Sequence, residues 1–148
     1  MKLEKIKLAF ESDYEVLKEL CPPPEYAPIH LENVYRWVFA TIEDSRNFQT
    51  QYHKNPKRFQ NASDARKCEG LALSMFDDLE KAKKRFKMLA DTIGAGVYAT
   101  LGTNIAKGFI TEKCGLNSNT DEFGHFNHHP AEDLPAQKSF VILEDEKL

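Results

Sequence analysis

Gly70-Leu71-Ala72-Leu73-Ser74-Met75-Phe76 leads directly into Asp77-Asp78 and then into the most regular helical pattern of the chain. The first stretch is short and apolar, as is typical of a buried strand. Between Leu79 and Ile93 apolar residues recur at a period of 3.6, which predicts a helix with one apolar face. Either aspartate is suited to cap the start of this helix, and Gly94 to end it. A strand followed at once by an amphipathic helix indicates a helix that packs on a sheet.

Three further core strands are expected outside this unit. Upstream, Val34-Tyr35-Arg36-Trp37-Val38-Phe39 is rich in β-branched and aromatic residues and predicts a strand buried on both faces. Downstream, Asn104–Ile110 predicts a third strand and Ser139–Leu143 the last one, before a frayed tail at Glu144–Leu148.

The remaining segments are less regular. Apolar and polar residues alternate over Ile6–Phe10, which predicts a half-buried strand, and a helix that starts at Ser12 should continue until the prolines after Cys21. Thr41–Glu69 reads as a long polar loop with a short helix near its end, and Cys114–Pro130 as a second loop.

The length of 148 residues, with 41% hydrophobic and 29% charged residues, fits one globular domain over residues 1–148. The expected class is α+β, with small mixed or antiparallel sheets on which helices pack. A net charge of −3 argues against nucleic-acid binding. We expect a cytoplasmic protein, because neither a signal peptide nor an apolar membrane segment is evident and three widely spaced cysteines are expected to remain reduced thiols.

Arg36 is the most informative single residue. It lies between apolar neighbours in an expected core strand, where a guanidinium is costly unless it is paired. Its planar fork suits a bound phosphate or carboxylate. The alternatives are a buried ion pair with an acid of the chain, or a strand edge from which the side chain reaches water.

Ser74 and the histidines near the end of the chain are the other candidates. Ser74 lacks the flanking glycines of a hydrolase nucleophile, so a packing role or a ligand contact remains. His125, after Gly124, is suited to orient a ribose hydroxyl or to act as an acid or base. A metal site of His125, His128 and His129 with a nearby acid is less favoured, since no regular helix orients the three rings.

Three patterns recur in an order that resembles the first half of the ADP-ribosyltransferase fold. They are Tyr35-Arg36 in an early strand, Lys57–Asn61 in the following loop, and the strand at Gly70–Ser74 that runs into Asp78–Ala82. The likeness covers Val34 to Leu89 and is strongest to RES-domain toxins, with toxins similar to type VI effectors as a second comparison.

The resemblance implies an enzyme that uses NAD as its substrate. Tyr35, Arg36, Arg58 and Ser74 would then contact the dinucleotide, with Arg36 at a phosphate or a ribose, Arg58 at the phosphates and Ser74 at the ribose beside the nicotinamide. The family places a third catalytic residue on a later strand, for which His125, Glu122 and Glu132 are candidates in that order. The catalytic set is therefore Arg36, Ser74, His125 and Glu122, without a metal.

The activity that the resemblance implies is that of an ADP-ribosyltransferase or an NAD-degrading bacterial toxin, with a protein target or an antitoxin or immunity protein as partner and no membrane contact. The alternative is a non-catalytic protein-binding module of a bacterial conflict system. It would use the aromatic residues Tyr52, Phe59 and Phe126, because aromatic side chains often anchor interfaces.

Overall fold

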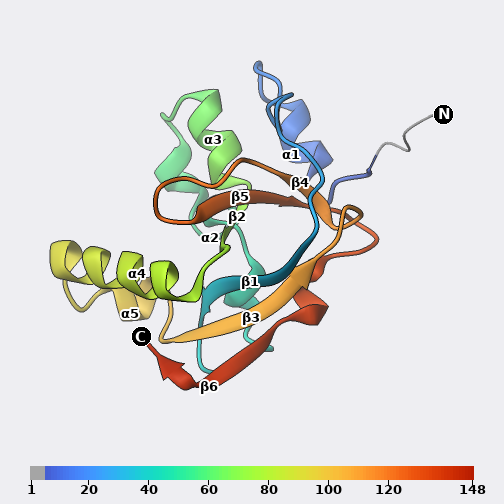
Figure 1. The fold of residues 1–148 in the computed structure, drawn as a ribbon. Helices are drawn as coiled ribbons and strands as arrows, with labels where there is room; N and C mark the ends of the chain where they lie inside the picture. Colours follow the sequence, from blue (N-terminus) through green and yellow to red (C-terminus); the bar gives the residue numbers. More distant parts are fainter. Residues whose placement is uncertain (1–5) are drawn as a thin grey trace.

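The computed structural model describes residues 6–148, and its strands form one antiparallel sheet in the order β4-β5-β2-β1-β3-β6 (Figure 1). The α+β class is thus confirmed, with a single six-stranded sheet in place of several small ones. The strands are β1 (Leu31–Val38), β2 (Leu73–Phe76), β3 (Asn104–Ile110), β4 (Gly115–Asn117), β5 (His125–Pro130) and β6 (Val141–Lys147).

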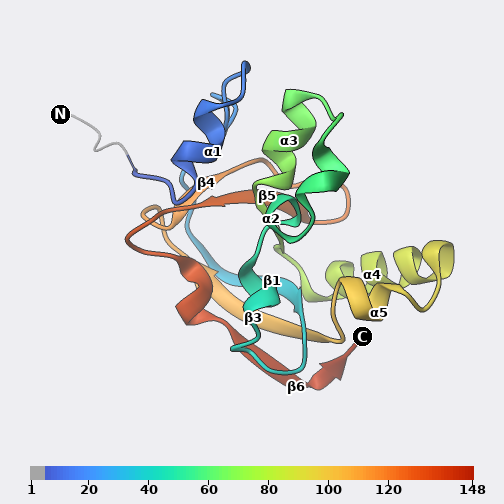
Figure 2. The ribbon, with the colours of Figure 1, turned by 180° about the vertical axis from the view of Figure 1, so that it is seen from behind.

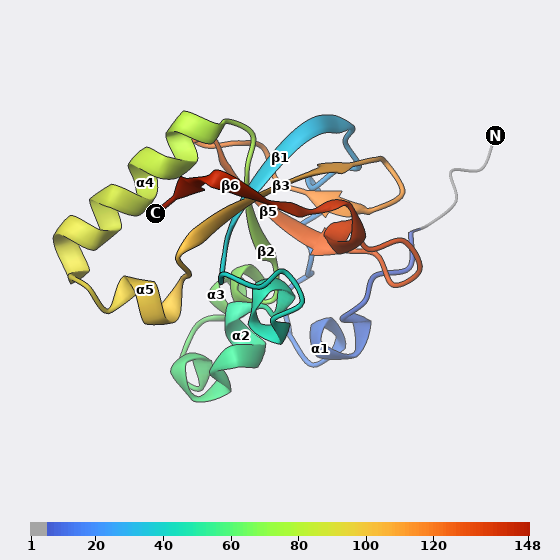
Figure 3. The same cartoon turned by 90° about the horizontal axis from the view of Figure 1, so that it is seen from below.

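The helices fall into two groups on the sheet. Figures 1 and 2 show α1 and α3 side by side near β5, and Figure 3 shows α4 on the side of the strands away from α2. The α-helices are α1 (Glu11–Glu15), α2 (Gln51–Lys54), α3 (Asp64–Gly70), α4 (Leu79–Ile93) and α5 (Val97–Thr100); the 3-10 helices are η1 (Ser45–Phe48), η2 (Pro56–Phe59) and η3 (Ala136–Ser139).

Helix α4 has the bounds and caps that its sequence predicts. The Asp78 carboxylate accepts a hydrogen bond from the main-chain N–H of Lys81 at 2.9 Å, and Gly94 follows the last turn with φ of 96°. Phe86 is buried and packs edge-on against Trp37 of β1, with ring centroids 5.2 Å apart. The apolar stripe therefore attaches α4 to the sheet.

The two faces of the sheet have different neighbours. Val34 and Val38 of β1 pack with Met75 of β2 and Phe126 of β5 in the main core. Trp37 and Phe76 point the other way, toward α4. Because side chains alternate along a strand, Arg36 lies on the main-core face and Ser74 on the α4 face.

A second core cluster forms beneath α1 and α3 from Leu8, Tyr14, Leu71 and a pair of cysteines. Cys21 and Cys68 form a disulfide, whereas Cys114 is a free, buried thiol. The expectation of three reduced thiols is therefore wrong. The two cysteines lie 47 residues apart in sequence, and the segment that follows α1 meets α3 near them through hydrogen bonds to Asp64. The cysteines thus no longer support a cytoplasmic location, which stays an expectation.

The N-terminal predictions also fail in part. Ile6–Phe10 forms no strand, only an isolated bridge between Leu8 and Ala131. Helix α1 ends at Glu15, and Val16 and Leu20, which lie within the predicted helix, are 77% and 70% exposed. Residues 1–5 lie outside the described part of the chain.

The two expected loops contain regular structure. Thr41–Glu69 contains η1, α2 and η2 as well as the expected short helix α3, which extends to Gly70 and shortens β2 at its start. Cys114–Pro130 contains β4 and β5, whose many polar residues conceal the strand pattern.

The predicted bounds of β3 are confirmed. Strand β6 runs on through the expected tail to Lys147, and an ion pair between Glu146 and Lys83 at 2.9 Å holds it near α4.

Within residues 6–148 we find no helix that has both the length and the apolar character needed to cross a bilayer.

Candidate functional site

Ser74 and His125 form a side-chain pair on the α4 face of the sheet. Ser74 lies inside β2 and His125 begins β5, so two neighbouring strands hold them. The Ser74 hydroxyl lies 3.0 Å from Nε2 of His125, within hydrogen-bonding distance. Ser74 is exposed and His125 partly exposed, which leaves the pair accessible to a ligand.

Asp121 is the acid that faces His125. Its Oδ2 lies 3.7 Å from Nδ1 of the ring, and its Oδ1 accepts hydrogen bonds from the main-chain N–H groups of Phe123 and His125 at 2.8 and 3.0 Å. Gly124, with φ of +68°, closes this tight turn. The turn fixes the carboxylate near Nδ1 of the imidazole, while the Ser74 hydroxyl contacts Nε2 of the same ring.

The environment keeps His125 neutral near pH 7. Burial is the main cause that lowers the pKa of His125 from its usual 6.5, and the positive charges of Arg85 and Arg36 lower it further, while Asp121 opposes them. A neutral imidazole has one nitrogen free to accept a proton. His125 is therefore in the form required of a general base.

Other polar groups surround the pair on the same face. Tyr35 of β1 lies directly opposite Phe76 and is partly exposed. Asn127 lies opposite Ser74, and its amide donates to the hydroxyl of Tyr26 at 3.3 Å. The Arg85 guanidinium of α4 lies 4.4 Å over the ring of Phe123, next to the turn that holds Asp121. The face thus combines hydroxyls, an amide and a cation around one imidazole.

Arg36 is placed differently from the expectation of a ligand contact. Its side chain is buried, with 6% exposed, on the main-core face, and its terminal nitrogens donate to the main-chain carbonyls of Ser74 and Asn47, the latter at 2.8 Å. Burial lowers its pKa to about 10. Arg36 thus neither pairs with an acid of the chain nor reaches water from a strand edge, which were the two alternatives to a ligand contact. Arg36 instead fixes the main chain of β2 at Ser74.

The other predicted residues do not join the pair. Arg58 is exposed in η2, where its guanidinium lies 5.8 Å from the ring of Phe59. Glu122 is exposed in the turn, and its neighbour Asp121 is the residue that reaches His125. Glu132 lies beyond the far end of β5 and pairs with Lys7 at 2.9 Å.

The metal site of three histidines is not formed. His125 and His129 lie on one face of β5 and His128 on the other, because the strand alternates. His128 is fully buried and its Nδ1 bonds to the side-chain oxygen of Asn117 at 2.6 Å. Burial lowers the pKa of His128 to about 3, so this ring is a neutral core residue.

Comparison of the chain with family models, with curated proteins and with solved structures gave no match. The fold and the arrangement around Ser74 therefore carry the functional argument.

Proposed function

We propose that this domain binds NAD on the α4 face of its sheet and cleaves the bond between nicotinamide and ribose, as an ADP-ribosyltransferase-like or NAD-degrading enzyme. The observation that carries the proposal is the hydrogen-bonding contact between Ser74 of β2 and His125 of β5 on an accessible face. Two residues that the resemblance singled out, Ser74 and His125, lie on the same face of the adjacent strands β2 and β5, whereas Arg36 of β1 lies on the opposite face.

The chemistry follows from the charges of the site. The glycosidic bond breaks with its electron pair leaving on nicotinamide, and the ribose becomes a positively charged, flattened oxocarbenium ion. The Asp121 carboxylate and the hydroxyl of Ser74 place negative charge and a dipole where that positive charge develops. Neutral His125 then accepts the proton of the water or acceptor group that adds to the ribose.

The positive charges near the site fit the pyrophosphate. Arg85 lies beside the turn of Asp121, and its guanidinium is suited to bidentate phosphate contacts. In this proposal Arg85 of α4 takes the role that the resemblance gave to Arg36 and Arg58. Arg36 acts as a positioning residue, since it holds the carbonyl of Ser74 from behind the sheet.

The test is the release of nicotinamide from NAD by the purified protein, measured by chromatography. We expect His125→Ala to lower the rate by about 100-fold or more, as for loss of a general base. His30→Ala is the matched control, because His30 is exposed and lies outside the site. A wild-type protein that neither binds nor consumes NAD contradicts the proposal, as does an unchanged rate in a folded His125→Ala protein.

A second candidate is a hydrolase with Ser74 as nucleophile. The order Asp121, His125, Ser74 favours it, because serine hydrolases place an acid, an imidazole and a serine in the same order, with the acid orienting the ring. Asp121 would have to approach His125 from its present 3.7 Å to form that hydrogen bond. A fluorophosphonate probe separates the two functions. Covalent labelling that Ser74→Ala abolishes supports the hydrolase, whereas NAD turnover in a protein that resists labelling supports the first proposal.

The remaining alternative is a protein-binding module. The aromatic residues expected to anchor its interface lie largely inside the fold. Phe59 and Phe126 are buried, with 4% and 0% exposed, and Tyr52 packs on Phe59 with ring centroids 5.5 Å apart. Capture of a partner by a protein that has no affinity for NAD is the result that would favour this alternative.

A further inference from the structure

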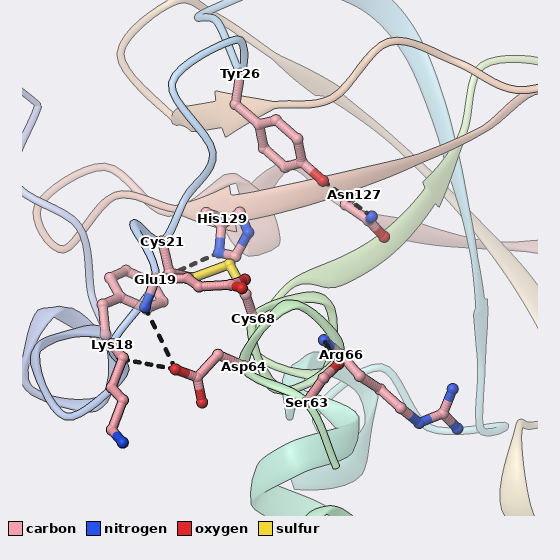
Figure 4. The surroundings of a disulfide bond; sticks show 11 residues. Lys18, Glu19, Cys21, Tyr26, Ser63, Asp64, Arg66, Cys68, Asn127 and His129 are labelled. Carbon is pink, nitrogen blue, oxygen red and sulfur yellow. Dashed lines mark hydrogen bonds between the residues drawn. A yellow bond between two sulfur atoms is a disulfide. The ribbon is translucent and has the colours of Figure 1, made fainter.

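Cys21, Cys68 and His129 bring three metal-ligating atoms together in the second core cluster. Each residue is buried, and the two sulfurs and a ring nitrogen all lie within 4.8 Å of one another. Figure 4 shows the His129 ring beside the sulfur–sulfur bond. This cluster is separate from the pair of Ser74 and His125, because the proposed NAD chemistry uses none of its residues.

His129 has an unsatisfied nitrogen in this cluster. The residue is 0% exposed, and within the described residues its Nε2 has no hydrogen-bond partner. A buried polar atom without a partner destabilises the folded state, which makes it an unusual feature of a core. Its Nδ1 lies 2.9 Å from the hydroxyl of Tyr14. With the proton on Nδ1 and donated to Tyr14, Nε2 presents its lone pair as a ligand, as outer contacts do for metal-bound histidines.

Three separate segments supply these ligands, and hydrogen bonds as well as the disulfide join two of them. Cys21 follows α1, Cys68 lies in α3 and His129 in β5. The Asp64 carboxylate at the start of α3 accepts hydrogen bonds from the main-chain N–H groups of Lys18 and Glu19 at 2.6 and 3.3 Å (Figure 4). These contacts keep the segment before Cys21 against α3.

A route into the cluster exists at its surface. Cys21 and Tyr14 line a cavity of about 560 Å³ that also contains Glu11 and Glu15. In the proposal below, this cavity admits the ion or the reductant, and it supplies a water molecule or one of its carboxylates as the fourth ligand.

We propose that the reduced protein binds one zinc ion through the thiolates of Cys21 and Cys68 and Nε2 of His129. Two thiolates and an imidazole are a donor set that zinc prefers in tetrahedral sites. A phosphine reductant and one water convert the disulfide into two thiols and a phosphine oxide. Zinc binding then releases the two thiol protons. The disulfide and the metal exclude each other, because the bonded sulfurs are not thiolates.

The experiment titrates the full chain with Co²⁺, a spectroscopic substitute for zinc, after anaerobic reduction by a phosphine. We expect one Co²⁺ per chain, with a sulfur-to-cobalt charge-transfer band and tetrahedral d–d bands that Zn²⁺ removes. The oxidised wild-type protein is the first control and should show neither band. Cys114→Ser is the matched variant control, because Cys114 is a buried free thiol elsewhere, and it should bind like the wild type.

The ligand variants complete the test. Cys68→Ser should weaken Co²⁺ binding by at least about 100-fold and His129→Asn by about 10-fold or more, in proteins whose circular dichroism shows that they are folded. The absence of thiolate bands in the reduced wild-type protein overturns the proposal. So does an equal loss of binding in Cys114→Ser. The reduced wild type carries no substitution, so its result decides the matter even where a variant does not fold.

Discussion

The indole N–H of Trp37 in β1 donates a hydrogen bond to the main-chain carbonyl of Ala82 in α4 at 3.0 Å. The same ring packs between Phe76 and Phe86, with ring centroids 4.9 and 5.2 Å away. This one side chain therefore joins α4 to the sheet through both a polar and an apolar contact, on the face that also carries Ser74.

Trp37→Phe removes the polar contact and keeps an aromatic ring in place. We expect the free energy of unfolding to fall by about 1–2 kcal/mol, because the Ala82 carbonyl loses its donor and part of the ring area is lost. Urea denaturation followed by circular dichroism measures this loss of stability. Tryptophan fluorescence is not suitable, because the substitution removes the single tryptophan of the chain. Tyr98→Phe, which trims an aromatic residue that is 40% exposed, should change stability by less than about 0.5 kcal/mol. An equal loss in both variants would contradict the role given to the indole.

Arg36→Lys should destabilise the protein although it keeps the charge. A lysine ammonium cannot reproduce the fork that reaches both Ser74 and Asn47, so one buried carbonyl is left without a donor. We expect a loss of about 2 kcal/mol or more in urea denaturation. Arg46→Lys is the control: its exposed ion pair with Asp44 at 2.8 Å should be worth less than about 1 kcal/mol.

Arg36→Lys also separates a positioning role from direct NAD contact. If Arg36 acts through the main chain of Ser74, the variant should lower kcat more than it raises KM for NAD, under conditions where it remains folded. A rise in KM alone would instead indicate that the guanidinium contacts the substrate.

Lys54→Met should stabilise the protein at pH 7. Burial is the main cause that lowers the pKa of Lys54 from 10.5 to about 8, and Arg36 and Arg46 add repulsion, so the charged amine destabilises the fold. Because the side chain is partly exposed, we expect a gain of only about 1 kcal/mol. Lys57→Met, at an exposed position, is the control.

The gain from Lys54→Met should depend on pH in a defined direction. Between about pH 8 and 10.5 the folded wild-type protein binds fewer protons at Lys54 than the unfolded chain does, so its stability rises with pH relative to the variant. The difference between the two proteins should therefore shrink over this range. A constant difference from about pH 7 to pH 10 would show that the charge of Lys54 is not its cause.

Gly102→Ala should be among the most damaging small substitutions. Gly102 has φ of +128°, and a Cβ there would lie 2.4 Å from the carbonyl oxygen of Val38, a main-chain atom that cannot move aside. We expect a loss of about 2 kcal/mol or more in thermal or urea unfolding. A Cβ added at Gly96 would meet no atom within 4 Å, and φ there is −58°, so Gly96→Ala should be neutral or slightly stabilising.

The parts of the fold that the sequence predicts are those in which a regular pattern is tied to burial. Helix α4 and strand β3 have an apolar period that stands out from their neighbours, and their predicted bounds are correct. Strand β5 escapes prediction because three of its six residues are histidines, two of them fully buried, and polar residues conceal a buried strand. The predicted helix at α1 is too long because Val16 and Leu20 continue an apolar pattern that tertiary packing does not use.

The candidate site, too, is predicted from the sequence only in part. Ser74 and His125 are candidates from local sequence alone, and the structure brings them together across two strands. Their alignment in β2 and β5 depends on a long-range register that no local pattern reveals. Asp121 does carry a local signal: an aspartate four residues before a histidine, with a glycine between them, is typical of a turn closed by the carboxylate. The partners of Arg36 are main-chain carbonyls, which no residue type in the sequence can indicate.

The order of the strands has a consequence for how the chain acquires its shape. Strand β2 pairs with β5, and β1 with β3, so the centre of the sheet is assembled from segments that synthesis delivers far apart in time. Among the described strands, β4 and β5 alone pair across a short connection. Such non-local topologies fold on the millisecond-to-second scale, well behind helical bundles of similar size. Until β5 has emerged, β2 presents an open edge, and Ser74 on it has no imidazole beside it.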